Sequence, residues 1–80
     1  MKRGSDTFVW GVRWETVERQ GDTPLYGAVL PDLYPSLGDA QQAQQRFDRE
    51  QPLRADPEIG GEPRPVRYEV YARQPDSPDR

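Results

Sequence analysis

A strict two-residue alternation over residues 7–17, TFVWGVRWETV, restricts what this chain can fold into more than any other stretch. One set of alternate positions holds Phe8, Trp10, Val12, Trp14 and Thr16. Because successive side chains of a strand point to opposite faces, this pattern predicts a half-buried β-strand. A chain of 80 residues without cysteine needs that apolar area, since a domain of this size buries only roughly 60% of its unfolded surface. We therefore expect both tryptophans to form core rather than a ligand platform.

The following segment predicts an antiparallel partner for this strand. Residues 19–24, RQGDTP, have the composition of a turn, in which Gly21 can adopt a positive φ. Residues 25–30, LYGAVL, then predict a second strand that is closed by Pro31. The simplest arrangement of the two strands is a hairpin.

Residues 31–52 change from a strand period to a helix period. Leu37, Ala40, Ala43 and Phe47 recur at helical spacing among glutamines and charged residues. Ser36 is placed to cap the first turn, with Asp39 three residues further on. Pro52 disfavours helical geometry at the residue before it, so the helix is expected to end near Glu50.

The remainder of the chain predicts one loop and one further strand. Residues 51–64, QPLRADPEIGGEPR, are rich in proline and glycine and predict a long loop, with Leu53 and Ile59 as its anchors to the core. Residues 66–73, VRYEVYAR, alternate again and predict a strand, central if it pairs with the first strand and otherwise at an edge. The polar ends, residues 1–6 and 74–80, predict a flexible N-terminus and a disordered tail.

These elements predict a single small α+β domain over residues 7–73. Its fold would be a three-stranded antiparallel sheet in β-β-α-β order, with one helix packed on its apolar face. The opposite, outer face would then carry mixed arginine, glutamate and tyrosine, a composition that serves equally as a solvated sheet face or as a protein-binding surface. The candidate partner-binding residues are Arg13, Arg67, Tyr71 and Arg73, together with Tyr26.

The composition argues against several classes of function. The chain has no histidine and no cysteine, the residues that most often serve as general base and thiol nucleophile. No phosphate-binding or dinucleotide motif occurs, so we expect no enzyme activity, no cofactor and no metal site. The net charge of −3 without a basic block disfavours nucleic acid. The absence of a long apolar run excludes a membrane span and favours a cytoplasmic protein.

Two resemblances rest on short quoted stretches. VWGVRW, YPSLGDAQQAQQRF and VRYEVYAR resemble small uncharacterised accessory proteins of actinobacteria and their phages, which share β-β-α-β patterning. The single lysine and the absence of asparagine also fit a GC-rich genome. Separately, Tyr34, Ser36 and Ala40 stand at a spacing similar to that of AP2-like arm-binding domains of phage integrases. That family places three strands before its helix, whereas this chain has one of its three predicted strands after it.

Together, these features predict a small non-catalytic protein of the adaptor or inhibitor type that binds another protein. The binding regions would be the outer sheet face and the loop at residues 51–64. Exposed strand edges are also compatible with a homodimer. The alternative from another class is an AP2-like DNA-binding module, which that resemblance implies would use Arg13, Arg67 and Arg73.

Overall fold

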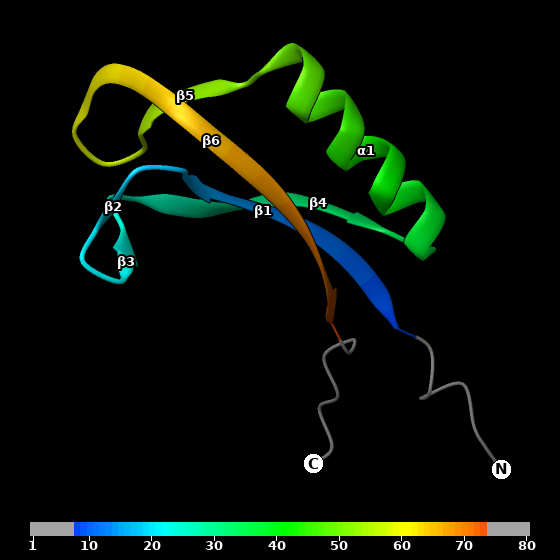
Figure 1. The fold of residues 1–80 in the computed structure, drawn as a ribbon. Helices are drawn as coiled ribbons and strands as arrows, with labels where there is room; N and C mark the ends of the chain where they lie inside the picture. The colour runs from blue at the N-terminus through cyan, green and yellow to red at the C-terminus, as the bar shows by residue number, and fades with distance from the viewer. Residues whose placement is uncertain (1–7, 74–80) are drawn as a thin grey trace, which may run out of the picture.

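The computed structural model describes residues 8–73, so the predictions for residues 1–6 and 74–80 lie outside the described residues. Most of this range is strand (Figure 1). In chain order the elements are β1 (Val9–Thr16), β2 (Arg19–Gln20), β3 (Thr23–Pro24), β4 (Gly27–Tyr34), α1 (Leu37–Glu50), β5 (Leu53–Asp56) and β6 (Gly60–Arg73). Across residues 8–73 no helix has the length and apolar character needed to cross a membrane.

The main sheet has four antiparallel strands in the order β4-β1-β6-β5 and is curled like half a barrel (Figure 1). β2 and β3 form a separate two-stranded sheet, whose turn contains Gly21 at a φ of 65°. The predicted three-stranded sheet in β-β-α-β order is therefore wrong. The last strand does pair with the first, from Val9↔Arg73 to Thr16↔Val66, and it lies inside the sheet.

The predicted loop at residues 51–64 is instead β5 and the first part of β6, and it supplies the strand that the prediction lacked. Gly60 and Gly61, with φ of 72° and 91°, allow the tight connection between the two strands. Pro65 is tolerated because β1 ends at Thr16, so no ladder bond from β1 requires an N–H there. Its carbonyl still accepts a hydrogen bond of 3.0 Å from the Val17 N–H.

β4 also differs from its prediction, because the strand continues through Pro31 as far as Tyr34. Its register with β1 shifts between Gly11 and Arg13, which accommodates extra residues of β4 around the proline. β4 lies at the edge of the sheet. A proline there does not interrupt pairing with a strand on the outer side.

The helix begins and ends where the sequence predicts. The Ser36 side chain accepts a hydrogen bond of 3.1 Å from the Asp39 N–H, and α1 continues to Glu50. Ala40 and Ala43 are buried, and Phe47 packs against the core from the last turn. The small alanine side chains leave room for the large rings of the sheet.

The core lies between α1 and the inner face of the sheet, where Val12, Trp14, Val66 and Tyr68 are buried with Ala43. Not every predicted core residue is buried: Phe8 and Leu37 are exposed, and Trp10 is half-buried. The predicted anchors are wrong, because Leu53 is 53% and Ile59 84% exposed.

Candidate protein-binding surface

The face of the sheet opposite α1 is not covered by a helix within residues 8–73. We call this the outer face, and its side chains come from alternate positions of three neighbouring strands. The register places Gly27, Glu15 and Arg67 in one row across the sheet, then Val29, Arg13 and Glu69, then Leu33, Gly11 and Tyr71, with Val9 and Arg73 last. The outer face therefore has a charged end, near Gly27, and a more apolar end, near Leu33.

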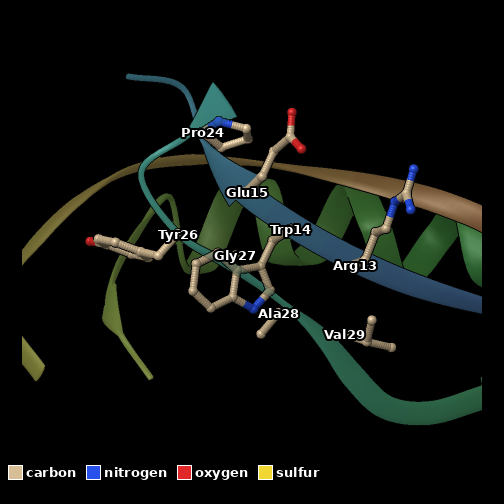
Figure 2. Close-up of a pocket in the computed structure, with 8 residues that line it drawn as sticks. All are labelled: Arg13, Trp14, Glu15, Pro24, Tyr26, Gly27, Ala28 and Val29. Atoms are coloured by element: carbon tan, nitrogen blue, oxygen red, sulfur yellow. The ribbon is translucent and has the colours of Figure 1, made fainter. Parts of the chain in front are cut away.

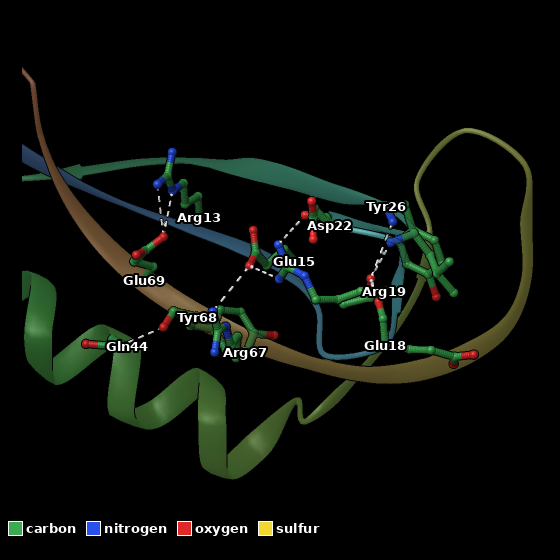
Figure 3. A network of polar contacts seen from close by, with 12 residues as sticks. Arg13, Glu15, Glu18, Arg19, Asp22, Tyr26, Gln44, Arg67, Tyr68 and Glu69 are labelled. Atoms are coloured by element: carbon green, nitrogen blue, oxygen red, sulfur yellow. Dashed lines mark hydrogen bonds and ion pairs between the residues drawn. The ribbon is translucent and has the colours of Figure 1, made fainter.

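Ion pairs occupy the charged end of the outer face (Figure 3). Arg13 donates to Glu69 at 3.0 Å, and Glu15 accepts from Arg19 at 3.4 Å and lies 3.5 Å from Arg67. These side chains are 33–67% exposed, so each pair contributes at most about 1 kcal/mol to folding. Their main effect is that the glutamates neutralise much of the arginine charge on this face.

Tyr71 lies over Gly11 at the apolar end. A Cβ added to Gly11 would lie 2.6–2.8 Å from three atoms at the far end of the Tyr71 side chain. The missing side chain at position 11 is therefore what allows the ring to lie against the β1 backbone, and the ring in turn shields that backbone from water. Tyr71 is half-buried as a result.

Two aliphatic side chains of β4 share the outer face with this tyrosine, Leu33 in the same row and Val29 in the next row. Val29 is 61% and Leu33 43% exposed, although both belong to a regular strand. Single exposed apolar residues are ordinary. Here, however, they share one face with Tyr71 and with the half-buried Val9, and such grouping is a feature of interaction surfaces.

A pocket of about 420 Å³ opens where β4 begins, next to the charged end of the outer face. It is lined by Trp14, Pro24, Tyr26, Ala28 and Val29, by Gly27, and by Arg13 and Glu15 (Figure 2). Arg13 and Glu15 lie on one side of β1 and Trp14 on the other (Figure 2). Because both faces of the sheet contribute to its lining, the pocket lies at the sheet edge.

Gly27 keeps β4 close to β1 at this pocket. A Cβ there would lie 2.6 Å from the Trp14 carbonyl oxygen and 3.2 Å from the Glu15 Cα. We expect Gly27→Ala to lower the free energy of unfolding by about 1–3 kcal/mol, because backbone atoms must move to admit the methyl group. Chemical denaturation followed by circular dichroism measures the change.

Gly38→Ala is the matched control, because the nearest atom to its added Cβ is Ser36 Oγ at 4.0 Å. Gly38 lies in the first turn of α1, so alanine there should instead raise stability, by up to about 1 kcal/mol. Equal stability of Gly27→Ala and the parent protein would contradict the close contact.

Four of the predicted partner-binding residues, Arg13, Arg67, Tyr71 and Arg73, occupy odd-numbered positions of β1 and β6 and so share the outer face. Tyr26 does not belong to it. Its ring packs edge-to-face on Trp14 with centroids 5.9 Å apart, and its hydroxyl donates to the Arg54 carbonyl oxygen at 2.7 Å. Tyr26 therefore contacts the core and lines the pocket.

Sequence reasoning missed Leu33 because it ended the strand at Pro31, and it missed Val29 because placing Tyr26 on the outer face assigns the odd-numbered positions of this strand to the core. The signal in the sequence is that Val29 and Leu33, on either side of Pro31, are both apolar residues at odd-numbered positions, as expected for one face of a strand that continues through the proline.

The other predicted binding region, residues 51–64, presents the exposed Ile59 at the turn between β5 and β6. Asp56 orders that turn by accepting from the Glu58 N–H at 2.8 Å.

Comparison with protein-family models, with curated proteins and with solved structures found no match to this chain. Among residues 8–73, no three acidic, histidine or cysteine side chains are grouped in a way that could hold a metal ion. The functional proposal therefore depends on the geometry of this chain alone.

Proposed function

We propose that this protein is a small non-catalytic binding protein of the adaptor or inhibitor type, which contacts a protein partner through the outer face. The observation that carries the proposal is the grouping of exposed Leu33, in the row of Tyr71, with exposed Val29, in the next row, on a sheet face that α1 does not cover. Apolar and aromatic side chains bordered by arginines are the composition of protein–protein interfaces. The exposed Ile59 between β5 and β6 supplies a second contact within residues 51–64.

The charges of the outer face favour a protein over a nucleic acid. Glu69 pairs with Arg13, and Glu15 lies between Arg19 and Arg67. Carboxylates at these positions would repel phosphates, and the chain as a whole carries −3. The AP2-like alternative is weakened further, because β5 and β6 of the main sheet both follow α1.

The proposal extends to a cytoplasmic protein that acts alone or as a homodimer, without a cofactor. Its residue usage supports a source among actinobacteria or their phages. The resemblance to small accessory proteins of actinobacteria and their phages rests on β-β-α-β patterning. That patterning does not support the proposed source, because the main sheet has four strands.

The test is capture of a partner from an actinobacterial lysate on the tagged full-length protein, with and without nuclease. We expect Val29→Glu combined with Leu33→Glu to reduce capture at least about tenfold, because truncation or desolvation at an interface centre costs 1–2 kcal/mol or more per residue. Quantitative mass spectrometry of the captured fraction measures the loss.

Gln42→Glu combined with Gln45→Glu is the control, since it adds the same two charges at exposed positions of α1. Capture should be unchanged by this control and by nuclease. Equal loss with both double variants, or a partner that disappears with nuclease, would contradict binding of a protein through the outer face.

A further inference from the structure

The first half of β4 has an open edge on the side away from β1. The Thr16 N–H donates to the Tyr26 carbonyl oxygen at 3.0 Å, so Tyr26 and the alternate residue Ala28 direct their main-chain groups toward β1. Gly27 and Val29 therefore direct their N–H and C=O groups the other way. No strand of the described chain pairs with that side of β4.

This edge lacks the charged side chains that commonly prevent strands of different molecules from pairing. Residues 27–30 are GAVL, and Asp32 is the only charged residue of β4. The regular edge ends at Pro31, which has no N–H and lies where the register of β4 with β1 shifts. The open edge is therefore short and uncharged.

The opposite edge of the main sheet is already occupied by contacts within the chain. On the side of β6 away from β1, the Val66 N–H donates to the Pro52 carbonyl oxygen at 3.0 Å. Farther along β6, the Tyr68 carbonyl oxygen accepts from Gln44 Nε2 at 2.8 Å. β5 has only four residues, and the Arg54 carbonyl oxygen accepts from a tyrosine hydroxyl at 2.7 Å. β4 is therefore the edge that is free to pair with another strand.

The open edge is complementary to itself in one antiparallel register. With a two-fold axis beside Ala28, Gly27 of each copy lies opposite Val29 of the other, and all their outward N–H and C=O groups are paired. An axis beside Val29 would place Gly27 opposite Pro31, which has no N–H. An axis beside Gly27 would place Val29 opposite Leu25, whose N–H already donates to a threonine hydroxyl of its own copy at 2.8 Å. The main chain therefore favours the register centred on Ala28.

The side chains of two copies are compatible in this register. On the outer face, Val29 is 61% exposed and would lie opposite Gly27, which has no side chain to obstruct it. On the core side, the small Ala28 side chains would face each other across the axis. Leu30 of the second copy would lie opposite Tyr26, whose ring lines the pocket. Apolar side chains of both copies would therefore cover the sheet edge at the pocket.

The charges beside the open edge do not oppose this pairing. In the register of β1 with β4, Glu15 lies next to Gly27 and Arg13 lies next to Val29. Each row across the two copies would therefore have Glu15 of one copy on one side and Arg13 of the other copy on the opposite side. Asp32 lies beyond the paired residues. Like charges are thus not placed in the same row.

We infer that this protein forms a symmetric homodimer in which β4 pairs with β4 of a second copy, with Gly27 opposite Val29. Because both copies use the same edge, the pairing closes at the dimer and does not continue into a filament. It joins the two main sheets and places both outer faces on one side of the combined sheet. The inference deepens the proposed function, on which the use of these faces rests, because such an adaptor presents two identical binding surfaces.

Analytical ultracentrifugation of the full-length protein, from low micromolar to millimolar concentration, tests the association. We expect a monomer–dimer equilibrium with a dissociation constant on the order of 10–500 μM, because a short strand ladder buries less area than a standard stable interface. Over the same range, hydrogen exchange of the Gly27 and Val29 amides should slow at least about threefold. The Ala28 amide, which is directed toward β1, should exchange slowly at every concentration.

Val29→Pro tests the main-chain pairing, because it removes an outward N–H from each copy. We expect it to weaken dimerisation at least about tenfold, since both symmetry-related hydrogen bonds are lost. Val29→Ile is the control, because it retains the N–H and an apolar side chain, and it should leave the dissociation constant unchanged. Circular dichroism verifies that both variants are folded.

A single introduced cysteine tests the register independently of proline. The chain has no cysteine of its own. Ala28→Cys places the two thiols directly opposite each other across the axis, whereas Val29→Cys places them on a longer diagonal. Under mild oxidation, non-reducing electrophoresis should therefore show a covalent dimer forming at least about tenfold faster for Ala28→Cys than for Val29→Cys.

Failure of this inference can be distinguished from failure of the proposed function. A protein that remains monomeric at millimolar concentration overturns the inference, as does a dimer whose Val29 amide exchanges freely. Equal crosslinking of the two cysteine variants, or a folded Val29→Pro variant that dimerises normally, also overturns it. Leu33→Glu should reduce partner capture without changing dimerisation, because Leu33 lies outside the paired residues. A dimer that captures no partner would contradict the proposed function alone.

Discussion

Replacing Trp14 with alanine is expected to lower the free energy of unfolding by about 3–5 kcal/mol, the usual cost of removing a large buried aromatic side chain. Trp14 is 4% exposed and belongs to the central cluster with Val12 and Tyr68. Its ring also contacts Tyr26 edge-to-face and lies 5.3 Å from the Arg54 guanidinium carbon. Domains of this size are stable by only about 4–12 kcal/mol in total, so the variant should lose a large share of its stability and should be partly unfolded at room temperature only if the parent protein lies at the lower end of that range.

Trp10→Ala is the control that separates burial from residue type. The sequence pattern assigns both tryptophans to the same strand face and predicts similar losses for the two. In the structure Trp10 is only half-buried and lies outside the central cluster. Urea denaturation followed by circular dichroism should therefore show a loss for Trp10→Ala less than half that for Trp14→Ala. Equal losses would mean that the core extends to the end of the sheet.

The elements that the sequence predicts well are those specified by local chemistry. Alternation locates β1 and the second half of β6, because the two faces of these strands meet such different surroundings. Ser36 and Pro52 mark the helix ends for similarly local reasons, a side-chain cap and a residue that cannot continue the helix. Neither the Ser36 cap nor the effect of Pro52 depends on which other segment of the chain lies nearby.

The strand segments that the sequence misses contain prolines or lie between them: β4 continues through Pro31, β6 begins before Pro63 and Pro65, and β5 lies between Pro52 and Pro57. Whether a proline ends a strand depends on whether a neighbouring strand needs its N–H, and that is a property of the sheet rather than of the segment. Pro31 lies in an edge strand, and Pro65 lies where β1 has ended. From the sequence alone, Pro31 closes a strand too early, and the prolines and glycines of residues 51–64 indicate a loop, so the predicted sheet lacks β5.

The residues of the outer face divide in the same way, into those that the local sequence pattern identifies and those that depend on how the strands are arranged in the sheet. The outer positions Arg13, Arg67, Tyr71 and Arg73 could be predicted because residue parity within one strand fixes the face. Leu33 could not be assigned to that face without the continuation of β4 past Pro31, and Val29 could not because Tyr26, at an even position of the same predicted strand, was expected there. Tyr26 is expected on the wrong surface because the sequence does not show which parity of residues 25–30 faces the core; in the structure Tyr26, Ala28 and Leu30 all pack against the core.

Arg54 is the residue whose role was least evident from the sequence, which placed it in a loop. Its guanidinium carbon lies 5.3–5.9 Å from the ring centres of Trp14, Phe47 and Tyr68. Its Nε donates to the Tyr68 hydroxyl at 2.6 Å, and that hydroxyl donates to the Gln51 carbonyl at 2.7 Å. Within the described residues no carboxylate forms an ion pair with Arg54, so its charge is stabilised by ring faces and hydrogen-bond acceptors.

We expect Arg54→Ala to lower the free energy of unfolding by about 2–4 kcal/mol, because two hydrogen bonds and the contacts with three rings are lost together. Arg54→Met should cost about half as much, since its side chain retains the apolar contacts of the arginine stem. Arg54→Lys should not restore full stability, because an ammonium group lacks the planar array of donors that serves Tyr68 and Gln51 at once.

A double-mutant cycle with Tyr68→Phe isolates the polar part of this arrangement. Arg54→Met and Tyr68→Phe should be coupled by about 1–2 kcal/mol in urea denaturation, since each removes one member of the same hydrogen-bonded pair. The coupling should change little between low and high salt, because a half-buried contact with a neutral hydroxyl is screened much less than a surface ion pair. Additive losses would show that Arg54 stabilises β5 only by packing its stem over the core, and a coupling that vanishes in salt would require a carboxylate partner.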